Sequence, residues 1–295
     1  MWTDIIALFI VGVLLVLLFV TWQCYLERQL DNPDLPRTRW TAPPLMKPSM
    51  WTRANGRFAV MQTIACVNSA AFGCWLVWVQ LYYQTYLDLS PIETMPRMVP
   101  LFVVGIAAVV FIALMIGRVN AMYIVATGTL MTGCADLLFA VIDPSAPFWA
   151  FCFPSASLVA LGADFTFAAG TLFVAKVSHP HEQSVAGALF QAMTQMGSAI
   201  GVSVSTIVFN SVLRTQSRRL GVAPDAQADN VPLPAQLKGY KAAMWTGFSF
   251  GILCAYCVAA PDRIFVFYST HFPRHDLVCH IFARGWHRWG DASSS

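Results

Sequence analysis

The amino-acid sequence predicts an all-α bundle of transmembrane helices with about seven spans. Three observations support this: 57% of the 295 residues are hydrophobic, only 11% are charged, and long apolar runs recur along the chain. Soluble globular domains carry about 25% charged residues, so the composition excludes an ordinary soluble domain. In lipid, only helices and closed barrels satisfy their backbone polar groups. The apolar runs are continuous rather than alternating, which favours helices.

Seven apolar runs reach the length of about 20 residues that a helix needs to cross the hydrocarbon core. The first, MWTDIIALFIVGVLLVLLFVTWQC, lacks the basic start and cleavage site of a signal peptide, so we expect it to be a span. The long loops 26–56 and 211–240 suggest that the helices divide as one, five and one. The expected spans are residues 5–25, 57–86, 98–117, 120–142, 148–175, 184–210 and 241–260.

The basic residues predict an orientation in the membrane. If Met1 lies outside, twelve of the 18 Lys and Arg residues fall on the inner side. Cytoplasmic segments carry an excess of Lys and Arg, so this orientation is the expected one. We expect an integral, multi-pass protein of the plasma membrane. The net charge of +3 is too small to suggest a nucleic-acid partner.

Enzyme and metal chemistry find little support in the sequence. It contains no Walker loop, GxGxxG, GxSxG or HExxH motif. Cys254 and Cys257 form a CxxC, but this lies in an apolar run without a second pair of ligands, so a zinc site is not expected. In HPHEQ, Pro180 favours a helix start over a metal site. We therefore expect no enzymatic activity, no metal and no cofactor.

Two long spans each carry one small or polar face. In span 148–175 such residues recur at three- and four-residue spacing, which places them on one side of a helix: Ser157, Ala160, Asp164, Ala168 and Thr171. Leu158, Phe165 and Leu172 lie on the far side and are expected to face lipid. Span 184–210 has the stripe Gly187, Gln191, Gln195, Ser198 and Ser205, opposite Leu189, Met193, Met196, Ile200, Val204 and Ile207. Close helix packing is expected at Gly187, Gly197 and Gly201.

Two further spans contribute polar side chains. Span 57–86 carries Gln62, Ser69, Gly73, Gln80 and Tyr83 along one side and ends in QLYYQTY. The tyrosines there fit solute contact and an aromatic belt at the lipid headgroups equally well. Span 120–142 carries Thr129, Thr132 and Asp136. Packed together, such faces enclose a wet or solute-filled interior, and its candidate lining residues are Gln80, Tyr83, Gln84, Ser157, Gln191 and Gln195.

Asp164 is the most unusual residue within the spans. A carboxylate near the bilayer midplane costs at least a few kcal/mol, so it normally has a partner or a water-filled cavity. One interpretation is a proton-coupling or substrate-binding residue. The other is a structural acceptor for a Gln or Thr of a neighbouring helix. No Lys or Arg lies inside the spans away from their ends, which favours a protonatable group. Asp136 is the second proton-coupling candidate.

Two stretches resemble a family of membrane transporters. GADFTFAAGTLFVAKVSHPHEQSVAGALFQAMTQMGSAIGVSVSTIVFN resembles the penultimate helix pair of fungal major facilitator transporters. The resemblance is to the fourteen-span drug:proton antiporter branch that includes aminotriazole-resistance-type pumps. EQSVAGAL and MGSAIG are its most specific parts. WVQLYYQTYLDLSPIETMPRMVPLFVVG resembles that branch's first C-domain helix, outer loop and next helix.

The resemblance covers about residues 1–260 and implies the C-terminal half of such a transporter. Residues 1–25 would be a linker-type transmembrane helix, 26–56 a cytoplasmic loop and 57–260 the six-helix C-terminal domain. The tail 261–295 is unlike the family and is expected to be an irregular cytoplasmic segment. The family's N-terminal six helices are not found. Because such transporters rock two domains around a midplane site, one domain lacks its counterpart.

The function implied by the resemblance is proton-coupled efflux of a drug, toxin or small polar compound. The expected partners are that solute, protons and the lipid bilayer, together with a missing N-terminal half or a full-length paralogue. The alternative is a fragment that does not transport but associates with or regulates a full-length transporter, or the product of a mispredicted gene. A seven-helix receptor is disfavoured, because no Asn-Pro pair lies in the last span.

Overall fold

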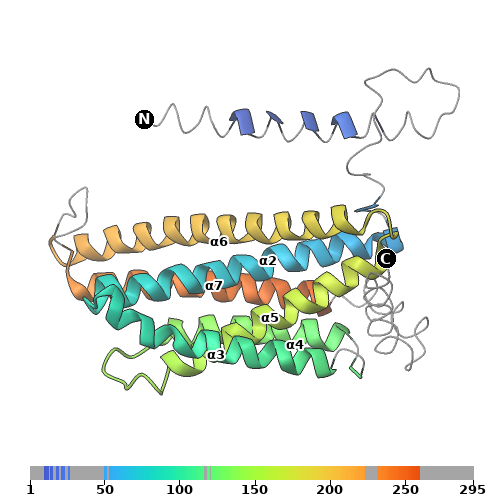
Figure 1. Cartoon of the computed structure of the whole chain (residues 1–295). Coiled ribbons are helices and arrows are strands. Elements are labelled where there is room, and N and C mark those ends of the chain that lie inside the picture. Colours follow the sequence, from blue (N-terminus) through green and yellow to red (C-terminus); the bar gives the residue numbers. More distant parts are fainter. Residues whose placement is uncertain are drawn as a thin grey trace, which may run out of the picture.

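The computed structural model of the chain is a bundle of long helices, and the residues that it describes contain no strand (Figure 1). It describes residues 50–51, 53–115, 118–119, 121–222 and 231–259, with scattered positions between Ile10 and Leu26. Within the described residues, six helices are long and apolar enough to cross a membrane, which confirms the predicted all-α class. The elements are α2 (Arg53–Leu81), the π-helical turn η2 (Tyr82–Tyr86), α3 (Pro91–Met115), α4 (Ala121–Ala140), α5 (Cys152–Val177), α6 (Gln183–Arg219) and α7 (Leu233–Ala259).

Some of the expected organisation lies outside the described residues. The first expected span, 5–25, is described only at scattered positions from Ile10 onward, and these are helical. Most of loop 26–56 and the whole tail 261–295 are not described. The domain boundaries at these segments therefore stay predictions.

Helix α3 begins at Pro91 rather than at the expected position 98, because a capping box closes its first turn. The backbone N–H and the hydroxyl of Ser90 both donate to Glu93 Oε2 at 2.9 Å. The Glu93 N–H donates back to Ser90 Oγ at 3.3 Å. Pro91 occupies the first helical position, where a missing N–H is tolerated.

The expected loop 211–240 is largely helical, which corrects the expected division of the helices. Helix α6 continues to Arg219 and α7 begins at Leu233. Leu213 of α6 packs with Val231 and Ala235 in a small apolar cluster, so the two helices stay in contact beyond the bilayer-length core. Helix α7 packs against α2, α4 and α6 and is not set apart from the others.

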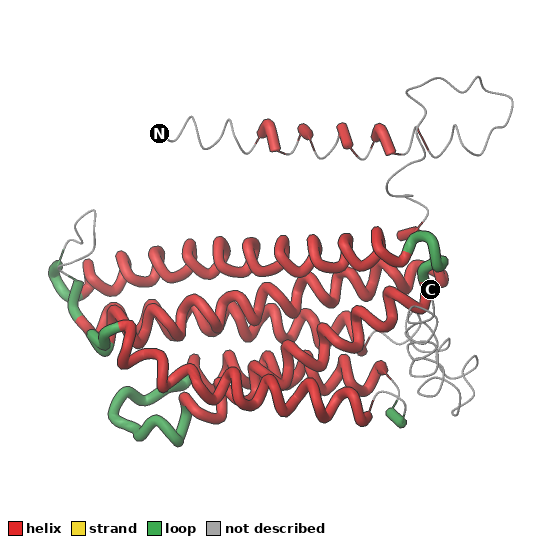
Figure 2. The backbone as a smooth tube through the Cα atoms, in the orientation of Figure 1, coloured by secondary structure: helices red, strands yellow, loops and turns green. Residues whose placement is uncertain are grey.

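Helices α4 and α2 each contact several neighbours, and both of them contact α5 and α7. Helix α4 lies against α5 and α7, while α2 contacts α5, α6 and α7. In Figure 1, α6 lies at the top and α3 and α4 at the bottom, with α2 and α7 between them. Helix α3 packs mainly against α5. The turns after η2, after α4 and after α6 gather at one end of the bundle, which we call the η2 end (Figure 2).

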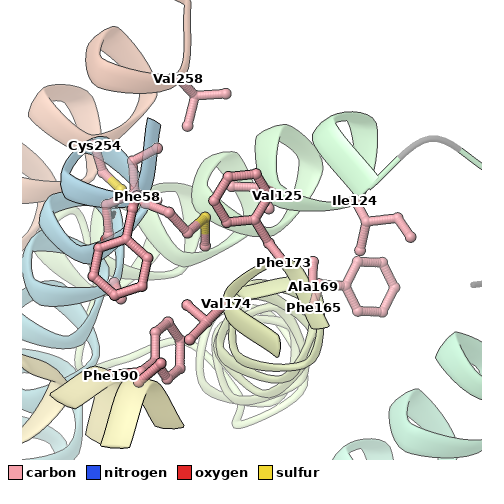
Figure 3. Packing of buried hydrophobic residues seen from close by; sticks show 14 of the residues in the cluster. Phe58, Ile124, Val125, Phe165, Ala169, Phe173, Val174, Phe190, Cys254 and Val258 are labelled. Carbon is pink, nitrogen blue, oxygen red and sulfur yellow. Dashed lines mark hydrogen bonds between the residues drawn. The ribbon is translucent and has the colours of Figure 1, made fainter. Parts of the chain in front are cut away.

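Two apolar clusters fill the bundle, one toward each end. The first holds the rings of Phe58, Phe165, Phe173 and Phe190 with aliphatic side chains around them (Figure 3). The second, toward the η2 end, is rich in aromatic residues: Trp75, Trp78, Tyr82, Tyr83, Phe139 and Tyr240. Its indoles are tied to polar groups of other helices. Trp75 Nε1 donates to Ser155 Oγ at 2.6 Å, and Trp78 Nε1 donates to Ser205 Oγ at 2.7 Å.

The apolar outer faces match the sequence pattern in part, since Leu158 of α5 and Leu189 of α6 are half-buried and pack against apolar clusters of the bundle. Met196, Ile200, Val204 and Ile207 of α6 are exposed on one side of the helix, as expected for a lipid-facing stripe. Phe165, expected to face lipid, is instead buried. Its ring stacks on Phe111 of α3 with centroids 6.0 Å apart. The expectation fails because α3 covers this side of α5.

Candidate functional site

A cavity of about 280 Å³ lies between α2, α5 and α6, midway between the two apolar clusters. Its wall combines one carboxylate, several amides and hydroxyls, and three phenylalanine rings. We call it the central cavity. Its lining residues are Ala65, Asn68, Ser69, Phe72, Ala163, Asp164, Thr166, Phe167, Phe190, Gln191, Thr194, Gln195 and Ser198.

Helix packing explains why Asp164 faces away from α4. Gly162 lies against α4: a Cβ built there would meet Thr132 Oγ1, the Thr132 amide N at 2.6 Å and Gly128 O at 2.7 Å. Two residues later, a helix has turned by about 200°, so the side chain of Asp164 points to the opposite side. There the carboxylate lines the central cavity, and its Oδ2 is 3.2 Å from where a Cβ on Gly105 of α3 would lie.

The glutamine stripe of α6 is held against α2 by two glycines. A Cβ on Gly197 would collide with the carbonyl of Cys66, and a Cβ on Gly201 with the carbonyl of Ala70. The two backbones therefore approach as closely as the small-xxx-small spacing predicts. Gly187 does not share this role, because it is exposed and a Cβ there would meet nothing within 4 Å.

The polar groups of the central cavity divide into satisfied and unsatisfied sets. The hydroxyls of Thr166 and Thr194 donate to carbonyls of their own helices at 3.0 and 2.7 Å. The side chains of Asp164, Gln191 and Gln195 make no hydrogen bond to any described residue. In the same part of the chain, Asn68 Oδ1 is buried without a partner. Buried polar atoms normally have a partner, so Asn68 suits a bound solute or water, and the half-buried Asp164 and the exposed Gln191 and Gln195 leave further polar atoms available beside it.

The charge of the cavity comes from one residue. Among its described lining residues, Asp164 alone is ionisable, and no Lys, Arg or His opposes it. Phe72, Phe167 and Phe190 supply apolar surface, and the last two rings lie 5.6 Å apart. The alternative role, a structural acceptor for a neighbouring Gln or Thr, has no corresponding hydrogen bond among the described residues. The wall as built suits a solute with an apolar body and a hydrogen-bonding or cationic group.

The second acidic candidate, Asp136, does not lie in the central cavity. It is 0% exposed between α4 and α7. Neither carboxylate oxygen has a hydrogen-bond partner in the described chain. A Cβ on Gly247 of α7 would lie 2.8 Å from its Oδ1, so the glycine makes the space for the carboxyl. Burying an ionised carboxyl without a partner costs free energy, so a carboxyl at this position is unusual for the core of a bundle.

The remaining predicted cavity residues lie elsewhere. Gln80 is exposed, and neither it nor the half-buried Gln84 lines the central cavity. Ser157 donates to the Phe153 carbonyl of its own helix at 2.9 Å. Tyr83 is buried and lines a separate cavity at the η2 end. These four residues therefore lie outside the central cavity, and their part in solute binding stays a prediction. For the three that follow Asn68 on α2 and η2, the reason is distance: the η2 end is about 20 Å from the level of Asn68.

Asn68 is a lining residue that the spacing argument missed, as are Thr166 and Thr194, whose hydroxyls donate to their own helices. Asn68 lies off the stripe that joins Gln62 to Ser69 and Gly73, so helical periodicity did not single it out. The sequence does contain a signal for Asn68, because its amide lies in the middle of the apolar run TIACVNSAAFG, just as the carboxyl of Asp164 lies in the middle of an apolar run. Unpaired polar residues deep in a span indicate a functional site by themselves.

The fold and cavity define the class of this protein: a multi-pass membrane protein whose spans surround a solute-sized polar cavity. The sequence model that describes the Major Facilitator Superfamily matches residues 4–210 of this chain, and the chain belongs to that superfamily. Its membership points to transport rather than to enzymatic catalysis.

Two fungal relatives are similar to parts of the chain. The "MFS-type transporter 1" of Pyricularia oryzae is 27% identical over 259 residues, which cover 84% of this chain and 40% of the relative. The "Efflux pump terJ" of Aspergillus terreus is 23% identical over 149 residues, which cover 50% of this chain and 29% of the pump. The chain therefore spans less than half the length of either relative that it matches.

Proposed function

We propose that this protein takes part in proton-coupled efflux of a small drug-like, toxic or polar solute, which binds in the central cavity. The observation that carries the proposal is the unpaired carboxylate of Asp164 in a polar cavity midway along α5. The amides of Asn68, Gln191 and Gln195 supply hydrogen bonds, and the phenylalanine rings supply apolar contact. The similarity to a protein named as an efflux pump supports the direction.

Asp164 is the proposed coupling residue because it is the one ionisable group among the described lining residues. A carboxyl that faces the solute can take up a proton when the solute leaves and release it when a cationic solute binds. Asp136 is proposed as a second proton-binding residue, because its carboxyl is fully buried without a partner. The two acids would then act at different places: one in the cavity, the other between α4 and α7.

The described helices are proposed to be the C-terminal domain of a transporter of the fourteen-span drug:proton antiporter branch, located in the plasma membrane. Gln191 and Gln195 support this, since both are exposed within the stretch of α6 expected to cross the bilayer. Exposed amides are unfavourable in lipid, so a second helical domain covering this face would account for them. Such a domain would also close the central cavity. It would come from an N-terminal half or from a full-length paralogue.

The second candidate function is association with a full-length transporter without transport by this chain alone. The observation that favours it is the short coverage of the relatives, 40% and 29% of their lengths. Sequencing the transcript upstream of Met1 separates the candidates. Six further spans in frame would support a complete transporter, whereas a true start at Met1 would favour the associating fragment.

Proton coupling can be tested with the purified chain in proteoliposomes, using ethidium as a fluorescent organic cation. We expect Asp164→Asn to abolish uptake driven by a pH gradient. The matched control is Asp88→Asn, because Asp88 is exposed in a turn at φ 51°, a conformation that Asn tolerates. Uptake that survives in Asp164→Asn would refute the coupling role. Uptake that needs a co-reconstituted full-length relative and is then unaffected by Asp164→Asn would favour the second candidate.

A further inference from the structure

A second cavity, of about 220 Å³, lies at the η2 end of the bundle. Its wall is built by η2, the second turn of α3 and the connection between α4 and α5. The residues that matter for its chemistry are Tyr82, Tyr83, Arg97, Asp143, Phe148 and Phe151. Cys152 of α5 also lines it, and twelve residues separate Cys152 from Asp164 along the helix, about 18 Å. The η2-end cavity is thus distinct from the central cavity.

Arg97 brings a positive charge to this cavity. Its guanidinium carbon lies 5.4 Å from the centre of the Tyr83 ring, a cation–π contact that fixes the group. Glu93, one helical turn earlier, is held by Ser90 instead. The guanidinium forms no ion pair or hydrogen bond with any described residue. Its planar fork of donors therefore stays available to an oxyanion.

Asp143 brings a negative charge to the same cavity. Its Oδ1 accepts hydrogen bonds from the Ser145 N–H at 3.0 Å and from the Ser145 hydroxyl at 2.8 Å. These bonds hold the pKa of Asp143 below its ordinary value, and the charge of Lys241 adds a smaller effect in the same direction. The carboxyl is therefore ionised at neutral pH. No ion pair joins it to Arg97 in the described structure, so the cavity holds both charges separately.

We propose that the η2-end cavity binds a zwitterion that carries an oxyanion and an ammonium group. The oxyanion meets Arg97, and the ammonium meets Asp143 among the rings of Tyr82, Phe148 and Phe151. A bare anion fits less well because Asp143 repels it, and a bare cation is repelled by Arg97. A free amino acid and a zwitterionic lipid headgroup share this chemistry. This site does not depend on the function proposed for the central cavity.

The test is calorimetric titration of the full chain, purified in a non-ionic detergent, with phenylalanine, phosphocholine and inorganic phosphate. We expect saturable binding of at least one zwitterion, weakened at least tenfold by Arg97→Gln and by Asp143→Asn. The second variant removes the charge but preserves the turn, because the side-chain amide oxygen still accepts from Ser145. The matched controls are Arg118→Gln, at the opposite end of α3, and Asp88→Asn, an exposed acid near η2.

Each outcome decides the proposal. Binding of phenylalanine identifies a free solute as the ligand, and binding of phosphocholine alone identifies the lipid headgroup. The proposal is overturned if neither zwitterion binds, or if phosphate binds more tightly than both. It is equally overturned if the Arg97 and Asp143 variants bind as the controls do. The melting temperature of each variant, compared with its control, verifies that the loss of binding is not a loss of fold.

Discussion

The close contact of α4 and α5 at Gly162 leads to a quantitative prediction about stability. In Gly162→Ala, the new Cβ would lie 2.6 Å from the Thr132 amide N and 2.7 Å from Gly128 O. Both are backbone atoms, so they cannot rotate away. To restore an ordinary contact of 3.4 Å, the helices must separate by about 0.8 Å. Overpacking of this kind destabilises by about 1–3 kcal/mol.

The matched control for this prediction is Gly187→Ala, which replaces an exposed helical glycine where a Cβ meets nothing within 4 Å. Both variants gain the same helix propensity of about 1 kcal/mol. The difference between them therefore isolates the packing effect. We expect Gly162→Ala to melt below Gly187→Ala by about 2–10 °C in detergent, followed by tryptophan fluorescence. Equal melting temperatures would refute the close approach of α4 and α5.

Three further predictions concern other contacts. Gly247→Ala should destabilise by about 1–3 kcal/mol, because its Cβ would lie 2.8 Å from Asp136 Oδ1; adding Asp136→Ala should recover most of the loss, and additive effects in this double-mutant cycle would contradict the contact. Ser205→Ala leaves the Trp78 indole N–H without its acceptor and should lower the free energy of unfolding by about 1–3 kcal/mol, whereas the exposed Ser203→Ala should not. Ser90→Ala removes the capping box of α3 and should cost about 1 kcal/mol; hydrogen exchange of the first turn of α3 should speed up, and unchanged exchange would argue against the cap.

Composition and the length of the apolar runs predicted the fold class, and helical periodicity predicted part of the central cavity, because all three can be read along the chain. Asp164, Gln191 and Gln195 line one cavity because residues three or four apart share a helix face. Gly197 and Gly201 lie at a helix crossing for the same reason. The sequence also contains the signal for the start of α3, since Ser90, Pro91 and Glu93 form a recognisable helix start. The expected span begins later because it is bounded by apolar residues, and the first turn of α3 is polar.

The remaining features depend on which helices become neighbours, and spacing along one helix does not contain that information. Phe165 is buried because α3 covers it, and Gly187 is free because no helix reaches it. Asp136 has the same kind of surroundings in the sequence as Asp164, yet it is enclosed between α4 and α7. The η2-end cavity joins Tyr83, Arg97 and Asp143 from three separate segments. Its two charged residues, Arg97 and Asp143, lie just outside the expected spans 98–117 and 120–142, in segments expected to be loops.

The most direct test of the central claim is equilibrium binding of ethidium to the purified chain, followed by fluorescence. We expect Asp164→Asn to weaken binding roughly tenfold, because it removes the ionised partner of a cation. Gln191→Ala, also in the cavity wall, should weaken it severalfold. Gln80→Ala should bind as the unmodified chain does, since Gln80 is exposed outside the cavity. Unchanged affinity in Asp164→Asn, or an equal loss in Gln80→Ala, would contradict a solute site between α2, α5 and α6.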